Sequence, residues 1–522
     1  MQRRFVSASS RALLATLARG SALALVFAGA ASVALARPAA AAPAESAAVA
    51  AGAAAGTPAP PPAAGATAAP IIAPPVAGGL TADEVAQRAA VSSHEVAARG
   101  EERSAAASGV DQANAAFIPR LSGVARYTRL SSIDQPSLGT LVAAPEGTPN
   151  PIPAGTPLAA VPLSFPVILD QYTSQATLQL PLSDYFLRLP QLRESAAKTA
   201  RAAALMEQAT RLRVATDARL GYYGWARARL QADVAQRAVA QARAHLKDAE
   251  AAHASGVSSK ADVLRVASQV ASAELLLARA TSAVAISERR LRTLMHDQSD
   301  RRFEIGEDLR GVPAGPEPGL LNQPQKDLVE QALVRRFEPR ALRETIAGTQ
   351  AQAGAVRAAG LPRLDAVGNA TYAKPNGRYF PQREEFRGTW DASLQLSWAP
   401  TDLFGAEAGH SAVLARSRQL EEERGVLVDG ITLEVVQGLE SLRESESAMT
   451  TSARGLEAAE ESYRVRRALY QNGRATSVEL TDAETEHSRA QLEAIGAQID
   501  RRIAAARLRH ALGNDSGEAD AK

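Results

Sequence analysis

Two short stretches of the sequence place the same residue types at the same spacing. In each, a glycine is followed three residues later by a hydroxyl side chain and, after three more, by a carboxylate: Gly256, Ser259 and Asp262, then Gly473, Thr476 and Glu479. This spacing is typical of a capping box, in which the hydroxyl and the acid each accept a backbone N–H at a helix start. The chemistry predicted here is therefore helix capping after a glycine-assisted chain reversal.

Other residues that could do chemistry form no catalytic pattern. The sequence has no Gly-rich phosphate loop, no H-E-x-x-H and no G-x-S-x-G, so we expect neither an enzyme nor a cofactor. It has no cysteine, which excludes disulfides, thiolate chemistry and a lipid anchor on cysteine. His245 and His253 are eight residues apart on a predicted helix, but without further ligands we interpret them as exposed residues, not a metal site.

The balance of charged residues and the N-terminal sequence limit which classes of protein this chain can belong to. Lys and Arg number 58 against 56 Asp and Glu, which gives no reason to expect a nucleic-acid partner. Residues 1–36 have basic residues, then an apolar run, then Ala-Leu-Ala, as in a cleaved secretory signal. Residues 37–79 are rich in Ala, Pro and Gly, which predicts a disordered or extended linker.

The chain aligns with itself as two copies of one unit. "IPRL" at 118–121 matches "LPRL" at 361–364, and further on one constant shift carries Gly256 onto Gly473 and Arg290 onto Arg507. Each copy begins with a helix of about 30 residues (81–116 and 325–360), ended by a proline. Two strand-like runs follow, and then a long helical hairpin whose tip is the capping motif.

The strand-like runs alternate strictly between apolar and polar residues. In the second copy Trp390, Leu394 and Trp398 lie on one face, and Asp391 and Gln395 on the other. Trp390 and Trp398 are about 26 Å apart on an ideal strand, which matches an outer-membrane apolar band with aromatic edges. The alternative is a soluble sandwich with two core tryptophans. Four strands are too few for a membrane barrel, so several chains would have to share one.

The long helices carry small and apolar residues at alternating spacings of three and four, which predicts coiled-coil packing. An arm of about 60 residues would reach roughly 90 Å. Together with the repeat, the Pro-Arg-Leu strand entries, the Leu-Gln-Leu second strands and the G-x-x-S/T-x-x-D/E tips, the sequence resembles the TolC-like outer-membrane efflux protein family from Leu80 to Gly513.

The resemblance implies a mainly helical fold with membrane strands: duplicated coiled-coil hairpins forming a periplasmic α-barrel, and four strands per chain in a trimeric 12-stranded outer-membrane β-barrel. It implies a homotrimer in outer-membrane lipid that docks a periplasmic adaptor and, through it, an inner-membrane transporter. The function implied is the passive exit duct of a tripartite efflux pump for small molecules or drugs. Alternatives are the duct of a type I secretion system, or a periplasmic coiled-coil adaptor without a barrel.

The resemblance also implies roles for tip residues. Glu479 and Asp482 match an acidic pair that rings the periplasmic mouth, as a pore constriction; the alternative is two solvated acids near a helix start. The tip residues expected at the adaptor-docking end are Gly256, Ser259, Asp262, Gly473, Arg474 and Thr476. The family's latch arginine is replaced by Ala475, with Arg474 next to it, so the closing contacts are expected to differ.

The expected segments follow from the repeat. They are a signal peptide (1–36), a linker (37–79), the first-copy short helix (80–116), β-hairpin with a long extracellular insert (117–186) and helical hairpin (187–296), an inter-repeat linker (297–324), the second-copy short helix (325–361), β-hairpin (362–405) and helical hairpin (406–513), and a tail (514–522).

Overall fold

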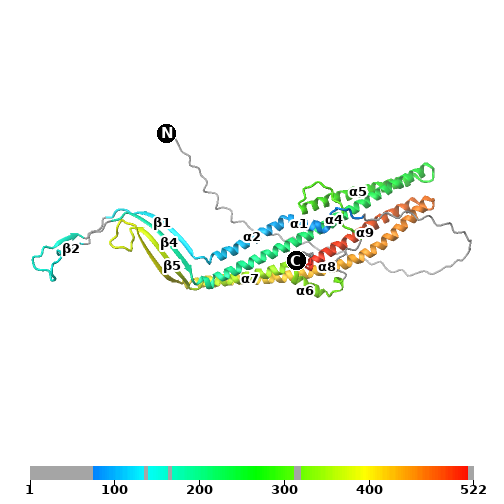
Figure 1. Cartoon of the computed structure of the whole chain (residues 1–522). Coiled ribbons are helices and arrows are strands. Elements are labelled where there is room, and N and C mark those ends of the chain that lie inside the picture. Colours follow the sequence, from blue (N-terminus) through cyan, green and yellow to red (C-terminus); the bar gives the residue numbers. More distant parts are fainter. Residues whose placement is uncertain (1–73, 134–138, 163–166, 311–318, 515–522) are drawn as a thin grey trace, which may run out of the picture. The chain divides into compact units, whose positions relative to one another are not determined.

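The computed structural model describes residues 74–133, 139–162, 167–310 and 319–514 (Figure 1). These residues belong to one compact unit, Ala69–Lys522. The predicted signal peptide, most of the 37–79 linker and nearly all of the C-terminal tail lie outside the described residues.

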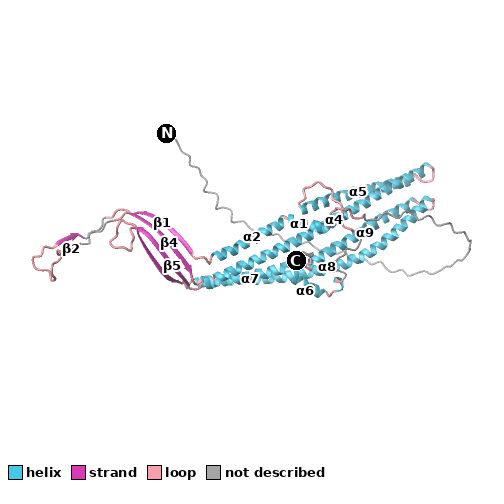
Figure 2. Cartoon of the chain, viewed as in Figure 1, coloured by secondary structure: helices cyan, strands magenta, loops and turns pink. Residues whose placement is uncertain are grey.

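Two long helical hairpins make up most of the described chain. The first consists of α4 (Leu189–Ala254) and α5 (Lys260–Met295), and the second of α8 (Asp402–Gln471) and α9 (Ser477–Ala511). Figure 2 shows these helices in cyan. The helix α4 also packs on α9 of the other hairpin. Both hairpins were predicted from the repeat, and the mainly helical fold is confirmed.

Both predicted capping boxes are present at the hairpin tips. Ser259 Oγ accepts the Asp262 amide at 3.2 Å, and Thr476 Oγ1 accepts the Glu479 amide at 3.3 Å. Gly256, just before the first box, has φ +80°, a left-handed conformation that L side chains rarely adopt. Gly473 repeats it with φ +69°. The sequence motif therefore builds the same tip twice.

The short helix expected at the start of each copy is in fact two helices, so that prediction was wrong. In the first copy α1 (Ala82–Ser92) and α2 (His94–Ala115) are separated by Ser93 in an extended conformation. Ser93 Oγ accepts the Glu95 amide at 3.2 Å, which makes Ser93 the N-cap of α2. One capping residue thus restarts the helix without ending its apolar periodicity.

The second copy has the same break between α6 (Gln325–Arg335) and α7 (Phe337–Ala358). Its cause is Pro339, which has no N–H to donate to the carbonyl of Arg335 in a continuous helix. Proline is tolerated in a first turn, so the helix begins again at Phe337. The buried side chain of Arg336 pairs at this break with Glu338 at 2.9 Å and Glu434 at 2.5 Å.

A four-stranded antiparallel sheet has the order β1-β4-β5-β6 (Figure 2, magenta). Its strands are β1 (Arg120–Arg129), β4 (Asp170–Pro181), β5 (Arg363–Lys374) and β6 (Arg387–Ser397). Each copy contributes one hairpin, and the two hairpins join through β4 and β5. In the single chain β1 and β6 are therefore edge strands.

The remaining elements are short. Within the long insert of the first copy, β2 (Thr140–Ala143) pairs with β3 (Ala159–Pro162), where the sequence predicted only a loop. The helix α3 (Asp184–Leu187) follows β4, and a 3₁₀ turn, η1 (Leu320–Asn322), precedes α6.

The largest core lies where α1, α4 and the inter-repeat segment meet. Trp225 and Tyr222 of α4 are fully buried there, and Tyr222 Oη donates to the carbonyl of Leu80 at 2.9 Å. Leu80 forms a parallel bridge with Ile305, beside which Gly79 and Gly306 approach each other too closely for any side chain. A second core surrounds Leu439 and Leu508. These cores hold the ends of α5 and α9 that are farthest from the tips, here called the base of the hairpins, against α4 and α8.

Candidate functional site

One face of the sheet is apolar and exposed. The strand register aligns Leu121, Leu178, Gly368 and Ala392 across the four strands on this face. Trp390 and Leu394 of β6 lie on the same face and are 76% and 71% exposed. Exposure of so many large apolar side chains side by side marks a surface that meets something other than water.

The opposite face is polar and internally hydrogen-bonded. Asn369 Oδ1 accepts Gln175 Nε2 at 3.1 Å and Thr177 Oγ1 at 2.8 Å, and Asn369 Nδ2 donates to Asp391 Oδ2 at 2.9 Å. This network joins three strands. A sheet with an apolar outer face and a hydrogen-bonded polar inner face is the pattern of an outer-membrane barrel wall.

An aromatic cluster that the sequence reasoning missed lies on the outer face. The rings of Tyr127 and Tyr172 are 5.0 Å apart, and Phe386 lies 6.0 Å from Tyr172 and 5.3 Å from Tyr372. The cluster joins β1, β4 and β5 with the residue that precedes β6, near the loop end of the sheet. Tyrosines at the ends of alternating runs were the available signal. Amphipathic rings of this kind suit a membrane–water boundary.

The two tryptophans expected at the membrane edges differ in setting. Trp390 lies within β6 and pairs with Ala370, which is two residues from Tyr372 on β5, toward the middle of the sheet. Trp398 follows the last residue of β6, and its Nε1 donates to the carbonyl of Gly360 at 3.3 Å. Gly388, which pairs with Tyr372, is ten residues from Trp398. In a barrel strand tilted by about 40° from the barrel axis, ten residues span a height of about 25 Å. That height equals an apolar band.

The two acids expected at the second tip have different surroundings. Glu479 accepts the backbone N–H of Thr476 at 2.9 Å and lies 3.3 Å from Arg466. The Thr476 amide is the first cause that holds the pKa of Glu479 below its usual value. Asp482 is exposed one turn later and has no hydrogen-bond or ion-pair partner among the described residues. Only Asp482 is thus free of a capping role.

The first tip carries the matching acid. Asp262 accepts both the hydroxyl and the amide of Ser259, at 2.7 and 3.3 Å, and the hydroxyl bond is the first cause that lowers its pKa. At the second tip Arg474 is exposed, and within the described part of the chain its guanidinium has no ion-pair partner. The single chain therefore shows no Arg474 latch.

His245 is buried, contrary to the exposed position expected for it. Its Nδ1 lies 3.2 Å from Glu484 Oε2, its Nε2 lies 3.5 Å from Ser477 Oγ, and its ring packs on Tyr470. The reason is that α4 packs on α5 with one face and on the second hairpin with another. His253 is exposed as expected.

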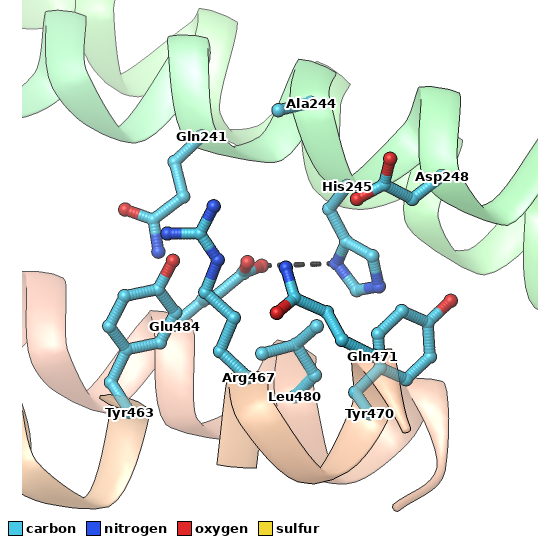
Figure 3. Close-up of a pocket in the computed structure, with 10 residues that line it drawn as sticks. All are labelled: Gln241, Ala244, His245, Asp248, Tyr463, Arg467, Tyr470, Gln471, Leu480 and Glu484. Atoms are coloured by element: carbon cyan, nitrogen blue, oxygen red, sulfur yellow. Dashed lines mark hydrogen bonds and ion pairs between the residues drawn. The ribbon is translucent and has the colours of Figure 1, made fainter. Parts of the chain in front are cut away.

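A cavity of about 250 Å³ lies beside His245, between the two hairpins (Figure 3). Glu484 and the Tyr463 ring point into it in Figure 3. Its walls come from α4, α8 and α9, and are formed by Gln241, Ala244, His245, Asp248, Tyr463, Arg467, Tyr470, Gln471, Leu480 and Glu484. Within the described ranges no group of three or more His, Cys, Asp or Glu side chains is placed to hold a metal ion.

One described helix, α5, is long and apolar enough to cross a membrane by length and composition alone. Only 11% of its most apolar window is buried in the single chain. A test on length and composition is weak evidence for a membrane helix, because helices that pack on other helices pass it too.

Comparison with solved structures finds the same fold in outer-membrane channels. The Campylobacter jejuni CmeC channel is 12% identical, with 84% of this chain and 87% of that chain covered and a TM-score of 0.65. The open Neisseria gonorrhoeae MtrE channel is 17% identical, with 83% and 88% covered and a TM-score of 0.65. Vibrio cholerae VceC is 16% identical, with 83% and 96% covered and a TM-score of 0.64. No curated protein sequence matches the chain significantly.

The family comparison is based on sequence and covers both copies. The model of the family described as "Outer membrane efflux protein" matches residues 85–295 and 328–514, which is most of the chain. The match begins in α1 and ends just after α9, and it includes both β-hairpins and both helical hairpins. The apolar sheet face, the aromatic cluster and the duplicated helical hairpins now have one explanation: the chain belongs to the outer membrane efflux protein family, non-enzymatic channels of the outer membrane with a helical extension into the periplasm.

Proposed function

We propose that three copies of this chain form one channel, the passive exit duct of a tripartite efflux pump that exports small molecules. The observation that carries the proposal is the sheet, which has an apolar outer face and a polar inner face but two unpaired edges, β1 and β6. Open edges are not tolerated in hydrocarbon. Pairing β1 of one copy with β6 of the next in a ring of three gives twelve strands and leaves no edge.

The first helical hairpin supports the same assembly. Leu264, Leu275 and Ile286 of α5 are exposed by 61%, 52% and 71% in the single chain. A long helix in the periplasm would not keep these side chains in water. A neighbouring copy of the chain would cover them, with the long helices of three copies surrounding a tunnel.

The tips are assigned to the periplasmic mouth. We propose that Glu479 and Asp482 of three copies form an acidic constriction, and that the tip residues around Gly256 and Gly473 contact a periplasmic adaptor. The exposed and unpaired state of Asp482 supports the first assignment. Rings of carboxylates favour cations in a narrow opening. Membership of a channel family argues against the alternative of a periplasmic adaptor.

A planar-bilayer experiment tests this function. The purified wild-type protein is expected to conduct as a trimer and to be blocked by a trivalent cation added on the periplasmic side. The double variant Glu479→Ala and Asp482→Ala should conduct more and resist the block. Glu486→Ala, which removes an exposed acid further along α9, should keep the wild-type block. Monomers without conductance would overturn the proposal, and an unchanged block in the double variant would remove the acidic constriction alone.

A further inference from the structure

Two of the seven histidines, His94 and His296, pack ring against ring. The rings of His94 and His296 are 4.6 Å apart in an edge-to-face arrangement, and both residues are exposed. Within the described ranges, no hydrogen bond or ion pair involves either ring. The other five histidines each have a polar partner, among them Glu484 for His245 and Ser258 for His253. All the ring nitrogens of this pair are therefore available.

The backbone fixes both histidines at one junction. His94 is the first residue of α2, directly after the Ser93 cap, and His296 is the C-cap of α5. The hydroxyl of Ser92 donates to the carbonyl of Met295 at 3.0 Å, which ties the two chain segments together next to the rings. The two imidazoles are thus held side by side by structure outside their own side chains.

The second copy shows that the fold does not need these histidines. The repeat places Phe337 at the position of His94 and Gly513 at the position of His296. His296 has φ +51° and is the only non-glycine residue with positive φ in the described part of the chain, whereas Gly513 adopts +70°. A left-handed conformation is unfavourable for a side chain with Cβ, and glycine avoids that penalty. The first copy keeps a histidine where glycine would fit better.

We propose that His94 and His296 bind one divalent transition-metal ion, through one ring nitrogen each. Imidazole suits Cu²⁺, Ni²⁺ and Zn²⁺, and copper should bind most tightly of the three. Metal–nitrogen bonds of about 2.0–2.1 Å place two nitrogens about 3.3 Å apart in a tetrahedral zinc site, and about 2.9 Å apart at neighbouring corners of a square-planar copper site. Exposed rings in contact reach that separation by turning about the bond to the ring. Water completes the coordination.

The neighbouring carboxylate does not complete a three-residue site. Asp297 Oδ1 accepts the amide of Ser299 at 2.8 Å, and among the described residues no third His, Cys, Asp or Glu is placed with the pair to hold a metal ion. Two imidazoles and water have no preference for hard cations, so Mg²⁺ and Ca²⁺ should not compete. The bound ion would join the end of α5 to the start of α2, and so stabilise the junction of the first copy.

The test uses the full-length protein in detergent with any affinity tag removed. Copper titration followed by calorimetry and electron paramagnetic resonance should give one Cu²⁺ per chain with two nitrogen ligands. His94→Phe and His296→Gly restore the residues of the second copy, so both variants should fold, and each should bind at least about tenfold more weakly. His253→Ala, another exposed histidine, should leave this binding unchanged.

The same measurements can overturn the proposal. If His94→Phe and His296→Gly bind copper as tightly as the wild type, the ion lies elsewhere. If the wild-type spectrum shows fewer than two nitrogen ligands, the two rings form only an aromatic contact. Neither readout depends on transport, so failure of the metal site is distinct from failure of the channel assignment.

Discussion

His245 of the first hairpin and Glu484 of the second form a buried hydrogen bond, with 3.2 Å between Nδ1 and Oε2. When Glu484 is ionised its carboxylate only accepts, so Nδ1 is then the donor of this bond. Ser477 and Glu484 lie two turns apart on one face of α9, and the ring of His245 contacts both. One side chain of α4 therefore positions the first turns of α9, the segment that also carries Glu479 and Asp482.

Removal of the Glu484 carboxylate should loosen the two hairpins. Glu484→Ala leaves the buried donor of His245 without a partner, which costs about 1–3 kcal/mol. We expect a lower urea midpoint in far-UV circular dichroism and faster proteolysis near the tips. Asp248→Ala is the control, because Asp248 borders the same cavity but is exposed. Equal stability of Glu484→Ala and wild type would show that this bond contributes nothing.

A methyl group at Gly306 should disrupt the base of the hairpins. A Cβ built there would lie 2.2 Å from the carbonyl oxygen of Gly79, and the Leu80–Ile305 bridge would have to separate. We expect Gly306→Ala to lower the free energy of unfolding by about 1–3 kcal/mol, as overpacking does. A Cβ at Gly109 in α2 meets nothing within 4 Å, so Gly109→Ala should raise the free energy of unfolding by about 0.5–1 kcal/mol. Thermal denaturation of both variants compares the two directly.

The two sheet faces can be compared at neighbouring residues of β6. Leu394 lies on the apolar face and Ser393 on the polar face. Leu394→Arg would place a charge against lipid, at a cost of about 2–4 kcal/mol near the bilayer midplane. It should reduce the amount of protein recovered in the outer-membrane fraction, whereas Ser393→Arg should be recovered normally. Equal recovery of the two variants would contradict the assignment of the faces.

The helix starts at the tips should be sensitive to acid. The pKa values of Asp262 and Glu479 are both lowered by the capping hydrogen bonds, so the bonds stabilise the tips at neutral pH. This stabilisation is complete above the ordinary values of about 3.9 and 4.3, and is lost as the pH falls through the lowered values. A spin label on Ala475→Cys should become more mobile only below about pH 4.

Variants distinguish this explanation from general acid unfolding. Thr476→Ala removes the second box, so the label should already be mobile at pH 7, with a loss of about 0.5–2 kcal/mol at that helix start. Asp482→Asn lies outside both boxes and should leave the transition in place. A label that stays immobile in Thr476→Ala would show that capping does not order the tip.

Local signals in the sequence were enough for the hairpins and their tips. Gly256 and Gly473, each followed by a hydroxyl and an acid, predicted both reversals, and the repeat predicted which strands and helices correspond. The alternation around Leu394 predicted two unlike sheet faces. These features depend on residues close together in sequence or on a comparison of the two copies.

The sequence could not predict features that depend on which element packs against a given face of a helix. The periodicity of α4 indicates one apolar stripe, which packs on α5 through Val239 and Ala242. It gives no sign of the second face, where His245 meets the other hairpin. The breaks at Ser93 and Arg336 were missed because the apolar period continues through a single extended residue. Roles at the periplasmic mouth came from family resemblance, and they depend on contacts between copies.

The free edges of β1 and β6 also constrain how the channel is made. A lone subunit has two such edges, and a pair of subunits would gain one seam yet still have two. In the ring of three copies proposed above, only addition of the third copy closes the barrel, so assemblies of one or two copies keep two unpaired edges. When little of the chain is synthesised, the yield of complete channels should therefore fall more steeply than the amount of chain. Cells in that state would accumulate incomplete assemblies, which proteases would degrade.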